Sequence, residues 1–378
     1  MSASWAAGPV SQVTDGPLVE SPAAQRGDLA MEAIGLSKDY RLKGGDVLPA
    51  VRDVTFNLYR GAVIALVGES GSGKSTVAKL LAGQEPMTSG RVTLNGQPVG
   101  YLSRREFRRY KSEVQLVFQD PFSSLNPVHT VRYHVSRPIL LHQLGSPRAL
   151  GEEVKRKLQD ELVSLMDQVR LTPAEHFLAK YPHELSGGQR QRVSFARALA
   201  ARPTVLLADE PVSMLDVSIR LEMLSLLDDL RQRFRLALLY ITHDIASARY
   251  FADEILVMYA GQVIERGPAE EVTQQPAHPY TQLLVASAPD PDNLGSILRS
   301  GGKRAARQQD VQARIVNACP FHPRCPLAED RCRSQKPPFV TISRQRGAAC
   351  WRLDVAAPKL MGGALAPAAG TVAQDASG

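Results

Sequence analysis

A glycine-rich stretch between an apolar run and a helical pattern constrains the fold more than any other feature of the sequence. Ala62–Val67 is a short, nearly continuous apolar run, which is typical of a buried parallel strand. Gly68-Glu-Ser-Gly-Ser-Gly-Lys-Ser-Thr76 follows it, and Val77–Ala82 continues with helical spacing. This order of strand, turn and helix predicts an α/β domain with the glycine-rich loop at the end of a buried strand.

The same loop has the composition of a phosphate-binding site. Glycines let backbone N–H groups approach phosphate oxygens, and the start of a helix adds partial positive charge. Lys74 is placed to reach the β- and γ-phosphates of ATP or GTP, and the Ser75 hydroxyl to bind Mg²⁺. The alternative is a chance glycine-rich turn, which the flanking strand and helix disfavour. The candidate nucleotide-binding residues of the loop are Gly68, Ser70, Gly71, Ser72, Gly73, Lys74, Ser75 and Thr76.

Polar residues follow other apolar runs that we expect to be strands of the same sheet. These runs are Val114–Phe118, Val205–Ala208, Leu236–Ile241 and Ile255–Met258. Asp209 suits a direct or indirect contact with Mg²⁺, and Glu210 suits the orientation or deprotonation of a water that attacks the γ-phosphate. An acidic helix cap is the alternative for this pair. Gln119 and His243 share the strand-end position, although by itself His243 is more often structural and Gln119 is uninformative.

Composition divides the chain into a long α/β part and a short basic part. We expect flexible tails at residues 1–30 and 353–378, an α/β domain at 31–275 and an extension at 276–352. Residues 293–352 hold 12 Lys/Arg, 3 Asp/Glu and all four cysteines, whereas residues 1–292 sum to −1 of the total +7. Within the α/β domain, residues 125–180 indicate an inserted helical subdomain, and Asp216–Phe234 a helix capped by Asp216.

The sequence contains no run approaching the roughly 20 apolar residues that cross a bilayer. Its first basic residue is Arg26, so the start does not have the charged region of a secretory signal. These observations predict a cytoplasmic protein.

Leu185-Ser-Gly-Gly-Gln-Arg-Gln-Arg192 resembles the signature motif of ATP-binding cassette (ABC) ATPases, and it lies upstream of Asp209 as in that family. Other stretches are similar to the family's aromatic loop, Q-loop, D-loop and H-loop, respectively Tyr40, Gln119, Ser213–Asp216 and Thr242–Asp244. The resemblance covers about residues 31–275, with seven motifs in order. It implies a P-loop ABC ATPase fold with a RecA-like core, an antiparallel β subdomain and an inserted helical subdomain.

The resemblance also implies roles for individual residues. In the family, two cassettes form a head-to-tail dimer, so Ser186, Gly187 and Gly188 of one subunit would close the ATP site of the other. Tyr40 would stack on adenine, and His243 would hold the γ-phosphate and the attacking water. Gln119 would contact Mg²⁺ and report the nucleotide state to membrane subunits. Asp216 of the D-loop completes the set of candidate nucleotide-binding residues.

Three further stretches, Phe118–Pro127, Tyr181–Ser186 and His278–Tyr280, look like those of oligopeptide/dipeptide importer ATPases. The implied partners are two transmembrane permease subunits, a second ABC ATPase and an extracytoplasmic peptide-binding protein, with this chain on the cytoplasmic side of the inner membrane. Some relatives carry nickel, glutathione or other small solutes instead. Met214 departs from the Ala common in the D-loop, and the polar link Ser300–Arg307 departs from the usual Pro-rich stretch.

The four cysteines, Cys319, Cys325, Cys332 and Cys350, suggest a metal site. A reducing cytoplasm disfavours disulfides, whereas four thiolates can hold Zn²⁺ or an iron–sulfur cluster. The long intervals lack the close Cys pairs of zinc modules, and spacing alone leaves cluster, zinc and unligated thiols open. Residues 318–328 are similar to the C-terminal motif of peptide-importer ATPases, which implies a [4Fe–4S] cluster.

The surroundings of the cysteines add two expectations. His322 is a further candidate ligand, although a loop histidine between Phe321 and Pro323 is more often structural. If the cluster forms, the basic side chains of Arg324, Arg331 and Arg333 could offset its negative charge.

Two alternatives involve nucleic acid. A soluble ABC ATPase acting on ribosomes or DNA would be expected to carry two cassettes or long coiled coils, and this chain has one lysine loop, one signature and no sustained heptads. A nucleic-acid-binding cysteine segment would be expected to interleave aromatic residues, and only Phe321, Phe339 and Trp351 are present. We therefore expect no nucleic-acid partner.

Overall fold

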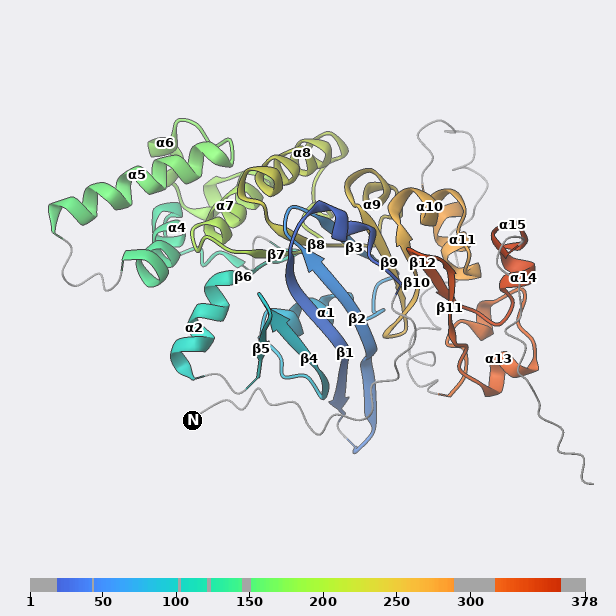
Figure 1. The fold of residues 1–378 in the computed structure, drawn as a ribbon. Helices are drawn as coiled ribbons and strands as arrows, with labels where there is room; N and C mark the ends of the chain where they lie inside the picture. Colours follow the sequence, from blue (N-terminus) through green and yellow to red (C-terminus); the bar gives the residue numbers. More distant parts are fainter. Residues whose placement is uncertain are drawn as a thin grey trace, which may run out of the picture.

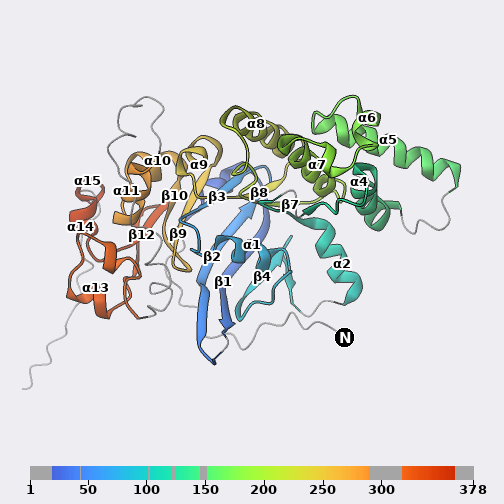
Figure 2. The ribbon, with the colours of Figure 1, turned by 180° about the vertical axis from the view of Figure 1, so that it is seen from behind.

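Two β-sheets organise the chain in the computed structural model, which describes residues 19–42, 44–100, 103–120, 124–144, 151–288 and 317–361. The larger sheet has eight strands in the order β11-β12-β10-β9-β3-β8-β7-β6, and the smaller has four in the order β2-β1-β4-β5. Helices α5 and α6 lie at one end of the molecule, and α13 to α15 at the other (Figures 1 and 2).

The centre of the larger sheet is parallel and apolar. Its strands are β3 (Val63–Val67), β6 (Val114–Val117), β7 (Val205–Asp209), β8 (Ala237–Thr242) and β9 (Glu254–Tyr259). Strand β3 pairs in parallel with β8 and β9, and β7 with β8 and β6. Every residue of β3, β7 and β8 is buried, as a strand covered on both faces requires. The predicted apolar runs are therefore confirmed as strands.

The C-terminal extension continues the same sheet. Strand β10 (Gln262–Pro268) pairs antiparallel with β9, and β12 (Arg346–Ala349) pairs with both β10 and β11 (Phe339–Ser343). The segment that carries the cysteines is thus built onto the cassette through the backbone of β10. No apolar pattern in the sequence predicts this pairing, because β11 alternates exposed and half-buried residues and β12 is four residues long.

The smaller sheet is antiparallel and packs over the first helix. It consists of β1 (Leu29–Arg41), β2 (Val47–Tyr59), β4 (Ser89–Leu94) and β5 (Gln97–Val99). Helix α1 (Lys74–Leu81) begins directly after the glycine-rich loop and shares one buried core with β1, β2 and β3. Helix α2 (Arg104–Glu113) then leads into β6.

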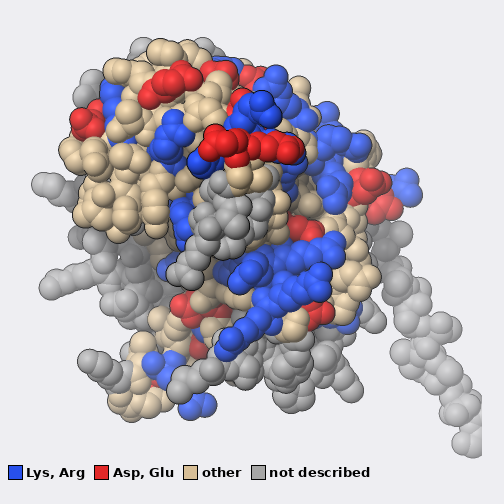
Figure 3. Space-filling model, turned by 90° about the vertical axis from the view of Figure 1, so that its left-hand side faces the viewer, with Lys and Arg blue, Asp and Glu red and all other residues tan. Residues whose placement is uncertain are grey.

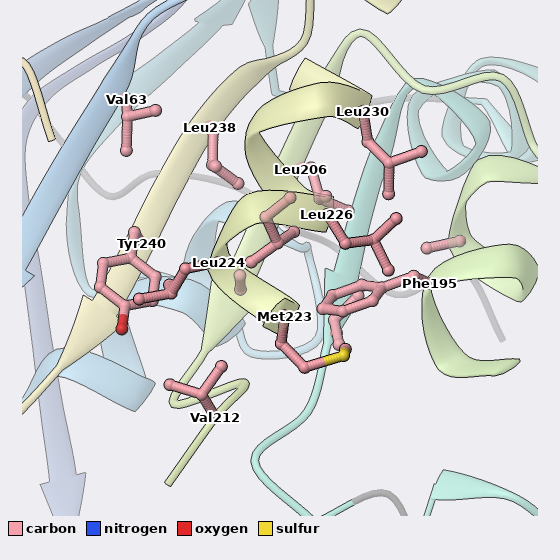
Figure 4. Close-up of a cluster of buried hydrophobic side chains, with 14 of the residues drawn as sticks. Val63, Phe195, Leu206, Val212, Met223, Leu224, Leu226, Leu230, Leu238 and Tyr240 are labelled. Atoms are coloured by element: carbon pink, nitrogen blue, oxygen red, sulfur yellow. The ribbon is translucent and has the colours of Figure 1, made fainter. Parts of the chain in front are cut away.

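A helical layer covers the other side of the parallel strands. Helices α4 (Val131–Ile139), α5 (Glu152–Gln168) and α6 (Ala174–Leu178) form the helical insertion expected over residues 125–180. Helix α7 (Gly187–Leu199) and α8 (Val217–Phe234) pack onto the sheet. Figure 4 shows Phe195 of α7 beside Met223 and Leu226 of α8, and all three are fully buried.

Shorter helices complete the fold. They are α9 (Ile245–Phe251), α10 (Ala269–Gln274), α11 (Pro279–Ala286), α13 (Asp330–Ser334), α14 (Leu353–Ala356) and α15 (Pro358–Met361), with 3₁₀ turns at Pro22–Arg26, Pro182–Glu184 and His322–Arg324, and a π-helical turn at Leu140–Leu144. Within the described ranges, none of the helices combines the length and the apolar character needed to cross a membrane.

The packed part of the chain extends beyond the ends expected from composition. The Ser21 hydroxyl donates to Glu254, and Arg26 forms an ion pair with Asp253 at 2.9 Å. Residues 19–30 are therefore packed against the start of β9 and do not form part of a flexible tail. Leu353 and Ala357 are likewise buried. The remaining parts of the two expected tails, residues 1–18 and 362–378, and the link Ser300–Arg307 lie outside the described residues.

Basic side chains also gather away from the cysteine segment. Figure 3 shows a group of Lys and Arg side chains on the face that lies to the left in Figure 1. Helix α2 lies on that side and carries four exposed arginines, Arg104, Arg105, Arg108 and Arg109. The net charge of the chain therefore does not describe how its charge is distributed.

Candidate functional site

The glycine-rich loop lies between β3 and α1, as expected. Gly71 and Gly73 have positive φ angles of 78° and 104°, which glycine adopts without strain. A Cβ added at Gly68 would collide with the carbonyl oxygen of Met258, and one at Gly73 with the carbonyl oxygen of Ala50. The loop therefore needs glycine at these positions for its conformation and its close packing.

Lys74 is folded back into this loop. Its ammonium donates to the carbonyl oxygens of Gly68 at 2.7 Å and Glu69 at 2.9 Å, and lies 3.5 Å from the Ser72 hydroxyl. Burial lowers the pKa of Lys74, while the nearby carboxylates of Glu210 and Asp209 act in the opposite direction. A buried cation at the centre of the loop is suited to bind phosphate.

Asp209 and Ser75, the residues predicted to contact Mg²⁺, lie together beside the loop. The Ser75 hydroxyl donates to Asp209 Oδ1 at 3.1 Å, which joins the start of α1 to the end of β7. Burial raises the pKa of Asp209, and the hydrogen bond from Ser75 partly opposes this. A hydroxyl and a carboxylate oxygen held together are ligands that Mg²⁺ accepts.

Three strand ends bring their polar residues together at Glu210. The Gln119 side-chain amide donates to Glu210 Oε2 at 3.1 Å, and His243 Nδ1 lies 3.1 Å from the same oxygen. Glu210 has a φ of 44°, a left-handed conformation that is uncommon for a residue with a side chain and that recurs at active sites. The exposed positions of Gln119 and His243 leave this cluster accessible. Gln119 contacts Glu210 here rather than the Ser75–Asp209 pair.

Tyr40 lies next to the loop on the other side. It hydrogen-bonds to the Thr76 side chain, and the Lys38 ammonium lies 4.9 Å from the centre of its ring. Desolvation raises the pKa of Tyr40, with Glu85 adding to the effect. The structure thus brings the predicted aromatic residue to the beginning of α1.

The signature residues lie at the beginning of α7. Ser186 caps this helix: its hydroxyl accepts from the Gln189 N–H at 3.3 Å, and Gln189 Oε1 accepts from the Ser186 N–H at 3.0 Å. Among the residues that the structure describes, no hydrogen bond or ion pair joins residues 186–188 to the phosphate loop of the same chain. Asp216 occupies the cap position of α8, but its side chain makes no capping hydrogen bond.

Two contacts to the loop were not predicted. The hydroxyl of Tyr280 accepts a hydrogen bond from the Glu69 N–H at 2.9 Å, and Arg324 donates to both carboxylate oxygens of Glu69 at 2.8 and 2.9 Å. Glu69 and Arg324 are 255 residues apart, so no local pattern could signal the pair. Arg324 was expected to offset the charge of a cluster, and it binds a carboxylate of the phosphate loop.

The four cysteines lie near enough to influence one another's pKa, and none of them forms a disulfide. The Cys319 N–H donates to the carbonyl oxygen of Cys332 at 2.9 Å. Burial raises the pKa of Cys319 to about 12, and the other three cysteines contribute in the same direction. In the described part of the chain, however, no three His, Cys, Asp or Glu side chains are arranged to hold a metal ion.

The residues around the cysteines have other partners than expected. Arg331 pairs with Glu329, and Arg333 with Asp330 at 3.5 Å. His322 Nδ1 lies 2.8 Å from the carbonyl oxygen of Cys319, which is a structural contact within the turn. The arginines thus find carboxylates as counter-charges.

Comparison with known proteins places these features in a family. The ABC transporter family matches residues 51–213, and the C-terminal region of oligopeptide/dipeptide transporters matches residues 264–332. The di/tripeptide transport ATP-binding protein DppF of Pseudomonas aeruginosa is 41% identical over 82% of this chain and 91% of its own length. The oligopeptide transport ATP-binding protein AppF of Bacillus subtilis is 38% identical over the same shares.

Solved structures support the same assignment. The dimeric, post-hydrolysis ATP-binding cassette MJ0796 bound to ADP and Pi superposes with a TM-score of 0.55 and 27% identity, over 64% of this chain and 99% of that one. The cassette cbiO1 from Clostridium perfringens gives a TM-score of 0.56 and 29% identity, over 66% of this chain and 92% of that one. The chain therefore belongs to the ABC transporter ATP-binding subunits, in the branch that carries the oligopeptide/dipeptide transporter C-terminal region.

Proposed function

We propose that this chain hydrolyses ATP to power the import of di- and oligopeptides through an ABC transporter permease. The observation that carries the proposal is the convergence of Gln119 and His243 on Glu210, beside the Ser75–Asp209 pair and the phosphate loop. The peptide specificity rests on the relatives' names and on the matched C-terminal region. Import of nickel, glutathione or another small solute is the alternative.

Each group has a place in the proposed hydrolysis. Lys74 leaves the two carbonyl oxygens that it contacts and binds the β- and γ-phosphates instead. Their negatively charged oxygens take the place of the carbonyl oxygens as hydrogen-bond acceptors. Ser75 and Asp209 would hold Mg²⁺, which when bound neutralises charge on the phosphate oxygens. Glu210 orients the attacking water and accepts its proton as the bond to the γ-phosphorus forms and the bond to the β-phosphate oxygen breaks. His243, on the same carboxylate oxygen, holds that side chain and contacts the γ-phosphate.

The signature residues call for a second subunit. Ser186 is exposed at the start of α7, where its hydroxyl and the helix N–H groups can meet a phosphate from outside. A head-to-tail dimer would place the signature residues of one subunit against the phosphate loop of the other. In each subunit, Tyr40 would stack on the adenine of the ATP bound at its own loop. The dimeric MJ0796 cassettes support this arrangement. The proposed assembly adds two permease subunits and an extracytoplasmic binding protein, with this chain on the cytoplasmic side of the membrane.

The same proposal includes a [4Fe–4S] cluster on Cys319, Cys325, Cys332 and Cys350, with zinc as the alternative. The resemblance of residues 318–328 to the cluster-binding motif supports a shared ligand, as does the effect of the other three cysteines on the pKa of Cys319. The described side chains are not arranged for a single ion, whereas a cluster spaces its thiolates more widely. Anaerobically purified protein should be brown and contain iron and acid-labile sulfide in equal amounts. A colourless protein with zinc or without metal would exclude the cluster.

Uptake measurements test the transport function. Deletion of the gene should abolish accumulation of labelled di- and tripeptides, and the intact gene, but not a Lys74→Ala copy, should restore it. Loss of nickel or glutathione uptake with normal peptide uptake would select the alternative. Copurification with RNA or DNA and without membrane subunits would refute both.

A further inference from the structure

Glu69, the second residue of the phosphate loop, is held at three points. Its carbonyl oxygen accepts from Lys74, its N–H donates to Tyr280, and its carboxylate pairs with Arg324. Lys74 belongs to the loop itself, but Tyr280 and Arg324 come from the C-terminal region that the oligopeptide/dipeptide transporter family matches. The loop conformation therefore depends on side chains from outside the cassette core.

The Tyr280 hydroxyl is aimed at the loop by buried packing. His278 caps α11 by accepting the Tyr280 N–H on its Nδ1 at 3.0 Å, and the His278 N–H donates to the buried Glu265 carboxylate at 2.8 Å. The Tyr280 ring packs against Tyr259 and Phe321, with centroids 4.6 and 5.5 Å apart. The motif His278–Tyr280 thus has a physical role: its histidine fixes the turn and its tyrosine reaches the phosphate loop.

Arg324 is fixed from the cysteine segment. It ends the 3₁₀ turn His322–Arg324, directly before Cys325, and its guanidinium lies 5.7 Å from the centre of the Phe321 ring. It also hydrogen-bonds to Tyr259. The side chains of Arg324 and Glu69 are 23% and 32% exposed, so water screens this two-point ion pair less than an open surface pair.

The charge of Glu69 gives this pair a consequence for nucleotide binding. An unpaired carboxylate in a loop that receives a triphosphate would repel the ligand, and Arg324 neutralises it. A loop already held in one shape also loses less conformational freedom when its N–H groups gather around phosphates. We propose that Arg324 and Tyr280 are positioning residues of the nucleotide site, by which the C-terminal region holds the phosphate loop ready for ATP. This inference rests on the proposed binding of ATP at the loop.

Two substitutions in the full-length protein test the proposal. Arg324→Gln should raise the Kd for Mg-ATP, measured by calorimetry, and the KM for ATP by about tenfold, as loss of a half-buried charged hydrogen-bonded pair predicts. The kcat should stay within about twofold, because binding of ground state and transition state weakens equally. Tyr280→Phe keeps the ring packing but loses the hydrogen bond to the loop, so it should raise the Kd for Mg-ATP and the KM for ATP by about threefold.

Rescue separates positioning from a purely structural role. Adding Glu69→Gln to Arg324→Gln removes the unpaired carboxylate but does not restore the two-point contact that holds the loop, so the double variant should recover only the part of the affinity lost to charge repulsion. Arg333→Gln is the matched control, because this arginine is exposed, lies in the same segment and has Asp330 as its ion-pair partner among the residues that the structure describes. Its Kd and KM should equal those of the wild type.

Three outcomes would overturn the inference. They are equal Kd values for Arg324→Gln and Arg333→Gln, complete recovery of affinity in the double variant, and a loss of affinity that merely follows a lowered midpoint of thermal unfolding. Failure of the wild-type protein to bind or hydrolyse ATP would instead refute the proposed function itself.

Discussion

The large sheet has two parts that are stabilised by different interactions: an apolar end, with strands β3, β8, β7 and β6, and an ionic end, with strands β10, β12 and β11. Strands β3, β7 and β8 are buried along their whole length, and their core is made of hydrophobic side chains packed against α7 and α8 (Figure 4). At β10 and β12 the central contact is an ion pair: Arg346 and Glu265 are 1% and 0% exposed, with 2.9 Å between Nη2 and Oε1. The C-terminal region adds a small apolar cluster of its own around Ala277, Ala348 and Leu353.

This difference has consequences for tolerance to substitution. An apolar core accepts exchanges that conserve volume, whereas a buried ion pair fails when one partner is removed. The apolar end carries the reacting groups after its strands, and the ionic end carries the residues that hold the phosphate loop. Substitutions at the apolar end should therefore change the rate of ATP hydrolysis, whereas substitutions at the ionic end should change stability and the position of the loop.

The largest expected effect is on the rate of ATP hydrolysis, through the reacting groups at the apolar end. Glu210→Gln should lower ATP hydrolysis by about a thousandfold, since it removes the proposed base but keeps a side chain of the same shape for Gln119 and His243. Lys74→Ala is the comparison variant: it should lose ATP binding, which Glu210→Gln should retain. Phosphate release and nucleotide binding measure the two effects. Hydrolysis at the wild-type rate in Glu210→Gln would contradict the assigned base.

A smaller effect, on stability, is expected at the ionic end. Arg346→Met should destabilise the C-terminal strands by about 3 kcal/mol, because it leaves a buried carboxylate without its cation. Glu265 would keep only the N–H groups of Ala277 and His278 among the contacts described here. Hydrogen exchange should accelerate at residues 339–349 and stay unchanged in β3.

The exposed pair Arg109–Glu113 supplies the control, since the Arg109 side chain is 81% exposed. Arg109→Met should change stability by no more than about 0.5 kcal/mol. Equal exchange rates in Arg346→Met and Arg109→Met would show that the buried pair does not hold β12. Uniformly faster exchange that includes β3 would show that the two ends of the sheet unfold together.

The same contrast explains what could be predicted from the sequence. Apolar runs reveal buried strands, and residues directly after parallel strands meet at one edge, so Gln119, Glu210 and His243 could be grouped in advance. The C-terminal region offers no such signal. Glu265 and Arg346 are 81 residues apart, Glu69 and Arg324 are 255 apart, and charged residues normally indicate surface. Composition predicts only an extension at residues 276–352, whereas the structure joins it to the sheet through β12.

The smallest of the three effects concerns pH and the junction between the two ends. Complete burial lowers the pKa of His278 to about 3, from its ordinary value near 6.5. Between these values the unfolded chain binds a proton that the folded chain does not, so stability falls as the pH falls below about 6.5. Between pH 6.5 and 5.0 the wild type should lose about 1.5 kcal/mol more than His278→Asn, whose amide oxygen can still cap α11.

Urea unfolding of both proteins at the two pH values measures this difference. All other titrating groups are common to both, so they cancel in the comparison. Equal losses would mean that His278 is protonated in the folded protein and that the turn before Tyr280 is not packed as described. A larger loss in the wild type would show that the sensitivity of stability to acid arises at His278, beside the Glu265–Arg346 pair. This is the turn from which Tyr280 reaches the phosphate loop, and it lies outside the apolar end that carries the reacting groups.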